Sequence, residues 1–198
     1  MVEWHIERKS EVFYKKAKAE GYRARSAYKL LEIQERFHII KNNNIVVDLG
    51  AAPGSWSQVA VKLVGDGGKV FGIDIQPVLG MPANFTYLRI DILKHPEKII
   101  SEIKSVDVVL SDLSHDFSGF KAADAGISIA LAQNSLMIAK AVLRNNGHMV
   151  CKLFQGPGSD EFIKETKACF EKVVVHKPKA SQKRSPEVYV VGLKFKKI

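Results

Sequence analysis

Short apolar runs alternate with segments of helical periodicity along most of the chain. Runs rich in β-branched residues predict seven strands, at 44–50, 69–75, 85–91, 106–112, 147–154, 172–177 and 187–195. Apolar positions three and four residues apart predict helices at 25–37, 55–65, 95–104, 121–144 and 159–170. The stretch Asn145-Asn146-Gly147 supplies the stop signal expected for the helix at 121–144.

The order of these elements indicates an α/β fold. Strands that alternate with helices are typical of a mostly parallel sheet with helices on both faces. No helix is predicted between 172–177 and 187–195, so these two strands are expected to form an antiparallel hairpin. We therefore predict a mostly parallel, seven-stranded sheet with an antiparallel C-terminal hairpin strand. A chain of 198 residues suits a single domain, 1–198, in which 1–41 forms a basic N-terminal helical extension.

Composition is that of an ordinary soluble protein, with 46% apolar and 26% charged residues. No apolar run approaches the roughly 20 residues of a membrane span, and the charged N-terminus lacks the apolar centre of a signal peptide. Cys151 and Cys169 form neither a disulfide framework nor a C-x-x-C motif. We therefore expect a cytoplasmic protein without a membrane partner.

The net charge of +9 is unevenly distributed along the chain. Residues 1–41 contain ten Lys or Arg against six acids, and residues 164–198 contain ten against three. The stretch between them, 42–163, is slightly acidic. Basic runs are often only solvated surface, but two basic ends also suit binding to a polyanion such as a nucleic acid.

Acidic residues end four of the predicted strands, and a glycine turn follows the first of them. The strand-end residues are Asp48, Asp74, Asp91 and Asp112. Gly50 and Gly54 lie in the turn DLGAAPGSW, where missing side chains let a ligand approach the backbone closely. Open parallel sheets bind ligands at the carboxyl ends of their strands, so these residues form a candidate binding site. Single aspartates in such places are also common helix caps and turn formers.

The glycine turn matches neither of two common nucleotide motifs. A P-loop needs a lysine after its last glycine, whereas Gly54 is followed by Ser55. The dinucleotide fingerprint G-x-G-x-x-G is absent as well. A third class is S-adenosylmethionine, which has no phosphates and carries a sulfonium cation and an ammonium group. Carboxylates at several strand ends suit that cofactor and would repel a pyrophosphate.

Position suggests a role for each residue of an S-adenosylmethionine site. Asp74, after the second strand, is placed for ribose hydroxyls, as an acid is in dinucleotide folds. Asp91 suits the adenine amino group, with Ile75 or Leu93 against the ring. Trp56, in the first turn of the next helix, is either a wall of the pocket or part of the core.

A lysine interrupts the predicted strand at 147–154. Lys152 follows Cys151 and precedes Leu153 near the end of an apolar run, although lysine is almost never fully buried without a partner. The side chain therefore either extends from the strand end into solvent or has a functional role.

Five segments resemble the FtsJ/RrmJ family of S-adenosylmethionine-dependent RNA 2′-O-ribose methyltransferases. They are RARSAYKL, VVDLGAAPGSWSQ, VLSDL, CKLFQG and SPEVYVV, and the similarity extends from residue 14 to residue 195. The resemblance implies a Rossmann-like S-adenosylmethionine-dependent methyltransferase fold. It implies a catalytic tetrad of Lys29, Asp112, Lys152 and Glu187. It also implies cofactor contacts at Gly54, Trp56, Asp74, Asp91 and Asp112, to which the site argument adds Gly50 and Ile75.

The tetrad suits methylation of a ribose 2′-hydroxyl. The hydroxyl proton has to be removed, and a lysine becomes a suitable base when desolvation or a nearby cation favours its neutral form. Lys29 and the sulfonium favour the neutral form of Lys152, whereas Asp112 favours the charged form, and the sequence leaves the balance open. We expect Lys152 to be this base, with Asp112 holding it in position and Glu187 orienting Lys29 or the ribose. No metal is required, because the leaving group is a neutral thioether.

The resemblance implies a uridine in large-subunit ribosomal RNA as the target, and ribosomal RNA or the large ribosomal subunit as the partner. The chain shows no dimerisation element, so we expect a monomer. The RNA surface is expected at two basic segments that lead to tetrad residues, 176–187 and the face formed by Lys15, Lys16, Lys18, Arg23 and Arg25.

Two alternatives remain open: the same chemistry on tRNA, and a non-catalytic RNA-binding factor in ribosome assembly. The chain also departs from the family at Ser114-His115-Asp116, where a small residue and a proline are usual after the aspartate. The backbone beside the substrate ribose is therefore expected to differ.

Overall fold

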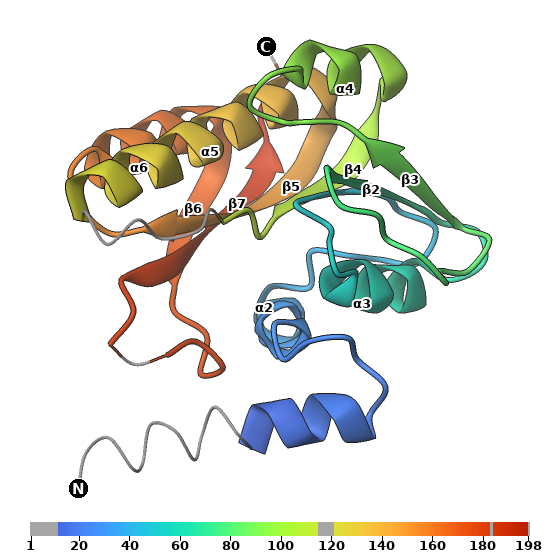
Figure 1. The fold of residues 1–198 in the computed structure, drawn as a ribbon. Coiled ribbons are helices and arrows are strands. Elements are labelled where there is room, and N and C mark those ends of the chain that lie inside the picture. Colours follow the sequence, from blue (N-terminus) through green and yellow to red (C-terminus); the bar gives the residue numbers. More distant parts are fainter. Residues whose placement is uncertain (1–11, 115–120, 183, 198) are drawn as a thin grey trace, which may run out of the picture.

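One sheet organises the computed structural model, which describes residues 12–114, 121–182 and 184–197 (Figure 1). Its seven strands lie in the order β3-β2-β1-β4-β5-β7-β6. The strands are β1 (Ile45–Leu49), β2 (Lys69–Asp74), β3 (Phe85–Arg89), β4 (Val106–Ser111), β5 (Leu143–Phe154), β6 (Phe170–His176) and β7 (Glu187–Phe195). The helices are α2 (Ala27–Phe37), α3 (Ser55–Val64), α4 (Pro96–Glu102), α5 (Lys121–Val142) and α6 (Ser159–Cys169), and a further helix covers 12–19.

The sheet is mostly parallel, as the sequence predicted. β1 pairs in parallel with β2 and β4, and β3 and β5 extend this parallel set on its two sides. β7 runs antiparallel to both of its neighbours, β5 and β6. The predicted C-terminal hairpin is therefore confirmed, with β7 occupying the place between β5 and β6.

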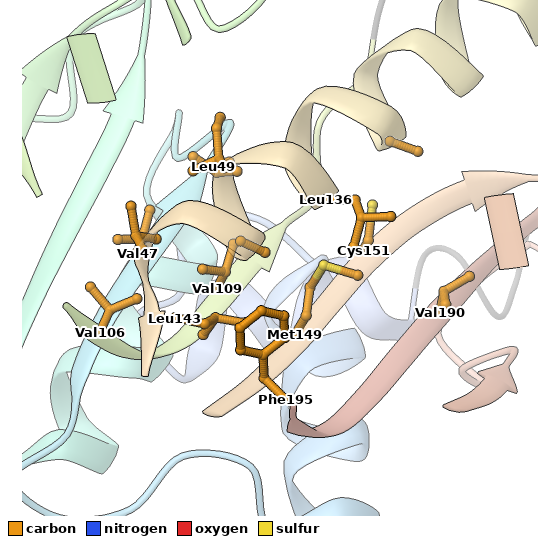
Figure 2. Packing of buried hydrophobic residues seen from close by; sticks show 14 of the residues in the cluster. Val47, Leu49, Val106, Val109, Leu136, Leu143, Met149, Cys151, Val190 and Phe195 are labelled. Atoms are coloured by element: carbon orange, nitrogen blue, oxygen red, sulfur yellow. The ribbon is translucent and has the colours of Figure 1, made fainter. Parts of the chain in front are cut away.

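Alternating side chains divide the sheet into two apolar faces, because successive residues of a strand point to opposite sides. In β1, Val46 packs with α2 and α3, whereas Val47 packs with the helices of the other face. Figure 1 shows α4, α5 and α6 along one face and α2 and α3 along the other. Figure 2 shows the core under α5, where Leu136 packs in one cluster with Met149 and Cys151 of β5. The predicted arrangement of helices on both faces is confirmed.

The junction between α5 and β5 differs from the prediction. α5 ends at Val142 and β5 follows directly, so the stretch 145–147 belongs to the strand and does not end the helix. The pairing of β4 with β5 shifts register between Val106 and Val108, and Asn146 has φ 63°. Asn and Gly readily adopt a left-handed backbone conformation, which is common at helix ends. Here an irregularity in the strand accommodates that conformation.

The helix over 12–19 and the loop between β6 and β7 contribute to one apolar cluster beside α2. Ala17 of this helix, Tyr28 of α2 and Ala180 of the loop form a small apolar cluster. The two basic segments recognised in the sequence therefore both adjoin α2. Within the described ranges, every helix is too short or too polar to span a bilayer.

Candidate active site

Lys152 lies on the face of the sheet that α2 and α3 cover. Its neighbour Cys151 belongs to the opposite core, and its cross-strand partner is Tyr189 of β7. Because side chains alternate along a strand, Lys152, Tyr189 and Glu187 point to the same side near the end of β5. Asp112 directly follows β4, which also ends at this edge of the sheet.

Lys29 of α2 reaches the same point and pairs with Glu187. Its Nζ lies 2.7 Å from Glu187 Oε1 and 2.8 Å from Oε2. Ser181 Oγ donates a further hydrogen bond of 2.7 Å to Oε1. Both charged residues are buried. A buried ion pair requires such close geometry and additional hydrogen bonds to offset the loss of hydration.

Two carboxylates flank Lys152. Its Nζ lies 3.5 Å from Asp112 Oδ1 and 3.6 Å from Glu187 Oε2, and only 10% of the side chain is exposed. These separations indicate ion pairs and exceed the length of good hydrogen bonds, so the amino group retains the capacity to bond a substrate. The structure thus brings together all four residues of the expected tetrad, including Lys29.

Tyr189 is a member of the site that the sequence reasoning missed. Its hydroxyl donates to Asp112 Oδ1 at 2.6 Å and accepts from Lys29 Nζ at 3.2 Å. The ring is fully buried and lies 5.5 Å from the Trp56 ring, measured between centroids. Because side chains alternate along a strand, positions 187 and 189 of SPEVYVV lie on one face. This alternation was the sequence signal that could have identified Tyr189 as a neighbour of Glu187. Together, these residues form the lysine–carboxylate cluster: Lys29, Asp112, Lys152, Glu187 and Tyr189.

Burial and neighbouring charges shift two groups of this cluster. Burial favours the neutral acid at Glu187, but Lys29 and Lys152 outweigh it and hold the pKa of that carboxyl below its usual value. Burial, with Asp112 and Glu187 acting in the same direction, raises the pKa of the Tyr189 hydroxyl well above its usual value. At neutral pH, Glu187 is therefore an anion and Tyr189 a neutral hydrogen-bond donor.

A cavity of about 340 Å³ adjoins the cluster at the carboxyl edge of the parallel strands, and the two share Asp112. This volume is in the range of small-ligand sites. The name carboxylate cavity is used for it below. Its lining comprises Gly50, Ala52, Asp74, Ile75, Gln76, Ile90, Asp91, Ile92, Leu93, Asp112, Leu113, Ser114 and Leu131. Five residues assigned to cofactor binding from the sequence are among them: Gly50, Asp74, Ile75, Asp91 and Asp112.

Backbone amides fix two carboxylates of the cavity. Asp74 accepts the N–H of Ala52 and the N–H of Gln76, each at 2.9 Å. Asp91 accepts the N–H of Lys94 at 3.2 Å, and the exposed ammonium group of that lysine lies 3.6 Å from the carboxylate. Among the described residues that line the cavity, none is Lys or Arg. The cavity therefore presents mainly negative charge to a ligand.

Asp48 is the fourth residue of β1 and lies inside the core. Ser57 Oγ donates to its Oδ2 at 2.6 Å, whereas Oδ1 has no hydrogen-bond partner among the described residues. Burial raises the pKa of the Asp48 carboxyl to about 7, against the lowering effect of Ser57 and with a further contribution from Asp112 and Asp74. Asp48 thus links β1 to α3 and is not part of the cavity lining.

Close neighbours shape the glycine turn. Gly50 has φ 78° and Gly54 has φ 110°, and a Cβ atom at Gly50 would lie 2.8 Å from the Leu113 side chain. Trp56 is buried in the core between α2, α3 and the sheet, and its Nε1 donates to Ser26 O at 2.9 Å. Gly54 and Trp56, assigned to the cofactor from the sequence, are not among the described residues that line the cavity.

The carboxylate cavity fits the chemistry of S-adenosylmethionine. Its carboxylates favour a ligand with two cationic groups, and Ile75 and Leu93 provide apolar contacts for a ring. Ser114 lines the cavity, whereas His115 and Asp116 lie outside the described residues. In the part of the chain that the structure describes, no group of three or more His, Cys, Asp or Glu is arranged to hold a metal ion.

Known proteins resemble this chain over nearly its full length. The model of the FtsJ-like methyltransferase family matches residues 22–195. Ribosomal RNA large subunit methyltransferase E of Acinetobacter baumannii is 46% identical over 198 residues, which cover 98% of this chain and 91% of that protein. The protein of the same name from Methanocaldococcus jannaschii is 42% identical over 200 residues, covering 97% and 81%.

Solved structures agree in fold. A ribosomal RNA methyltransferase structure from Plasmodium falciparum has a TM-score of 0.77 at 27% identity, covering 88% of this chain and 98% of that one. Aeropyrum pernix fibrillarin in complex with S-adenosylmethionine has a TM-score of 0.57 at 14% identity, covering 78% and 68%, and shows the shared fold alone. By the family match and the identity to its relatives, this chain belongs to the FtsJ-like methyltransferase family.

Proposed function

We propose that the protein transfers a methyl group from S-adenosylmethionine to the ribose 2′-hydroxyl of a uridine in large-subunit ribosomal RNA. One observation carries this proposal: Asp112 lines the carboxylate cavity and also lies 3.5 Å from Lys152 Nζ. A candidate base is thus adjacent to a candidate cofactor site, as methyl transfer to a hydroxyl requires. The names of relatives at 42% and 46% identity support ribosomal RNA as the substrate.

The cofactor is assigned to the carboxylate cavity. When bound there, S-adenosylmethionine supplies an electrophilic methyl group attached to positively charged sulfur. Asp74 is assigned to the ribose hydroxyls and Asp91 to the adenine amino group, with Ile75 against the ring. Gly50 lets the ligand approach the backbone, and the charge of Asp112 favours the cationic end of the cofactor.

The lysine–carboxylate cluster is assigned to the removal of the hydroxyl proton. The Lys152 ammonium group first releases a proton to solvent; the resulting amine takes the hydroxyl proton of the ribose and later passes it to solvent. Asp112 and Glu187 stabilise the ammonium group that forms. Lys29 balances the charge of Glu187, and the Tyr189 hydroxyl fixes the orientation of the Asp112 carboxylate at 2.6 Å.

The two basic segments are assigned to RNA. Exposed cations occur on the helix over 12–19 and on the loop between β6 and β7, and they include Lys15, Lys16, Lys18, Lys179 and Arg184. The small apolar cluster around Tyr28 joins these segments next to Lys29. Binding through phosphates would weaken with salt, with a log–log slope of about −0.7 per contact for single-stranded RNA.

The partner in this proposal is ribosomal RNA, either free or in the large ribosomal subunit, and the location that follows from this substrate is the cytoplasm. One copy of the 1–198 domain is expected to suffice, because a single chain contributes both lysines, both carboxylates and the cavity.

The test is methyl transfer from labelled S-adenosylmethionine to ribosomal RNA, large subunits and tRNA, all taken from cells that lack this enzyme. Resistance to alkaline cleavage would map a methylated ribose. Lys152→Ala tests the base, and Lys140→Ala is a matched control because Lys140 is exposed on α5 and pairs with Glu165.

Signal at one ribosomal RNA ribose that is lost only in Lys152→Ala would support the proposal. Signal confined to tRNA would keep the chemistry and change the substrate. Cofactor binding without transfer to any RNA would favour a non-catalytic RNA-binding factor in ribosome assembly.

A further inference from the structure

Arg23 belongs to the basic N-terminal segment, yet its guanidinium group bonds the backbone beside the carboxylate cavity. Nη1 donates to the carbonyl oxygen of Pro53 at 2.7 Å. Nη2 donates to the carbonyl oxygen of Leu79 and, at 3.3 Å, to that of Gly80. The donor groups expected to bind RNA phosphates are therefore engaged with the protein itself.

The bonded carbonyls come from the two loops that form one side of the cavity. Pro53 lies in the glycine turn after β1, immediately after the lining residue Ala52. Leu79 lies in the loop between β2 and β3, which begins with the lining residues Ile75 and Gln76. Asp74 joins the same two loops, because it accepts one N–H from Ala52 and one from Gln76. Asp74 and Arg23 thus connect the same loops at two separate points.

Gly54 provides the space that this arrangement needs. A Cβ atom at position 54 would lie 2.8 Å from Arg23 Nη1 and 3.0 Å from a methyl carbon of Val78, and the φ of 110° is itself unfavourable for other residues. The absence of a side chain therefore allows the guanidinium group to lie close to the turn.

Gln58 of α3 fixes the backbone that carries Arg23. Its side-chain oxygen accepts the Arg23 N–H at 2.9 Å, and its side-chain nitrogen donates to Gly21 O at 3.1 Å. Both ends of one amide side chain thereby hold residues 21–23. The position of the guanidinium group is set by α3 as well as by the carbonyls that it bonds.

From this geometry we infer that Arg23 is a positioning residue for the cofactor: it holds the glycine turn and the β2–β3 loop at the separation that S-adenosylmethionine requires. This inference rests on the cofactor site proposed above. Arg23 acts through the two loops and touches neither cofactor nor RNA. A planar guanidinium group reaches carbonyls of both loops at once, whereas the single ammonium group of a lysine does not reproduce this fork.

The test measures the Kd for S-adenosylmethionine by calorimetry, without RNA, for the wild type, Arg23→Ala and Arg23→Lys. Loss of hydrogen bonds from a charged donor is expected to raise the Kd about tenfold in Arg23→Ala. Arg23→Lys is expected to retain most of that increase. Arg144→Ala is the matched control, since Arg144 is exposed at the start of β5, where it pairs with Asp107, and its Kd is expected to equal that of the wild type.

RNA binding separates positioning from phosphate contact. Both Arg23 variants are expected to keep the RNA affinity and salt slope of the wild type. An unchanged cofactor Kd, together with weaker RNA binding and a salt slope reduced by about 0.7, would overturn the inference and make Arg23 a phosphate contact. Full recovery of the cofactor Kd in Arg23→Lys would also overturn it, because charge alone would then suffice.

Amide hydrogen exchange of the ligand-free protein tests the loop connection independently of cofactor binding. Arg23→Ala is expected to accelerate exchange in 75–81, and Gln58→Ala to do so more weakly, without a general acceleration in the β-sheet core. Unchanged exchange in 75–81 would contradict the inference. If the wild type did not bind S-adenosylmethionine, the proposed cofactor site would fail, while the exchange measurement would still decide whether Arg23 orders the loops.

Discussion

The lysine–carboxylate cluster and the carboxylate cavity share Asp112 but balance their charges in different ways. In the cluster, Lys29 and Lys152 lie within 3.6 Å of carboxylates, and a buried hydroxyl completes the network. In the cavity, Asp74 is bonded by two backbone amides, and the cation next to Asp91 is an exposed lysine. The cluster is therefore electrically balanced by the chain alone, whereas the cavity keeps an excess of negative charge.

This difference separates catalysis from binding. Groups that are paired before the substrate arrives require little rearrangement during the reaction, which is the basis of electrostatic preorganisation. A cavity with excess negative charge attracts a cationic ligand and would lose that attraction once a neutral product forms. Substitutions in the cluster should therefore change rate and stability, and substitutions in the cavity should change affinity for the cofactor.

Lys152→Ala is expected to have the largest effect on methyl transfer. Loss of a general base lowers the rate of methyl transfer by about 10³-fold. The Kd for S-adenosylmethionine should change little, because Lys152 is not among the described residues that line the cavity. Single-turnover transfer and calorimetry measure the two quantities. A large loss of cofactor affinity in Lys152→Ala would contradict the claim that the cluster serves catalysis and the cavity serves cofactor binding.

Glu187→Gln is expected to destabilise the protein by about 3 kcal/mol, because Lys29 and Lys152 lose a buried counter-charge. Urea denaturation measures the loss. Glu171→Gln is the matched control: its ion pair with Lys194 is about half exposed, and removal of such a pair costs less than about 1 kcal/mol. The pKa of Glu187 is lowered in the folded state, so its contribution exists at neutral pH and disappears as the pH falls through that lowered value. Equal losses in the two variants would contradict this account.

Asp48 is expected to give the opposite dependence of protein stability on pH. Its folded-state pKa of about 7 exceeds the ordinary value of 3.8, so the folded protein retains a proton that the unfolded chain has already released. Stability should therefore fall as the pH rises from 4 to 7, by about 1.4 kcal/mol per unit from this group. Asp48→Asn should flatten the profile, whereas Asp66→Asn, at an exposed position, should not. If stability changed with pH in the same way in the wild type and in Asp48→Asn, the raised pKa of Asp48 would be refuted.

Of the four substitutions, Asp74→Asn is expected to have the smallest effect, which is a change in the free energy of cofactor binding. The loss of one negative charge and of one acceptor for the backbone amides should raise the Kd for S-adenosylmethionine about tenfold. The rate of methyl transfer at saturating cofactor should stay within about twofold of the wild type. Asp66→Asn again serves as the control. A fall in the saturated rate with an unchanged Kd would show that the cavity carboxylate takes part in catalysis.

Sequence patterns predicted the strands well because their signal is local. Successive strand residues point to opposite faces of the sheet, as Val46 and Val47 do. The same alternation places Lys152 within an apolar strand, and its unusual position could therefore be recognised from the sequence. Glu187 and Lys29 were harder to connect, because they are 158 residues apart and meet only once β7 lies between β5 and β6. The family resemblance, and not the residue pattern, supplied that pairing.

Three features escaped the sequence for physical reasons. Tyr189 looks like an ordinary strand residue until its hydroxyl meets Asp112, which is 77 positions away. Arg23 counts as a surface charge unless the carbonyls of a distant loop are known to lie within its reach. The start of β5 was obscured because the stretch 145–147 has residues typical of a helix end, and only the pairing with β4 shows that it belongs to a strand.

The reversed direction of β7 has a further consequence for this architecture. β7 begins at the edge where β4 and β5 end, so Glu187 is the first residue of its strand, and the described residues between His176 and Glu187 lie at the rim of the site. Ser181 anchors this stretch to Glu187, and Ala180 packs against Tyr28 of α2. A returning strand of this kind ties the loop that precedes it to the carboxylate that pairs with Lys29, so a change in the loop can reach the site through a single hydroxyl.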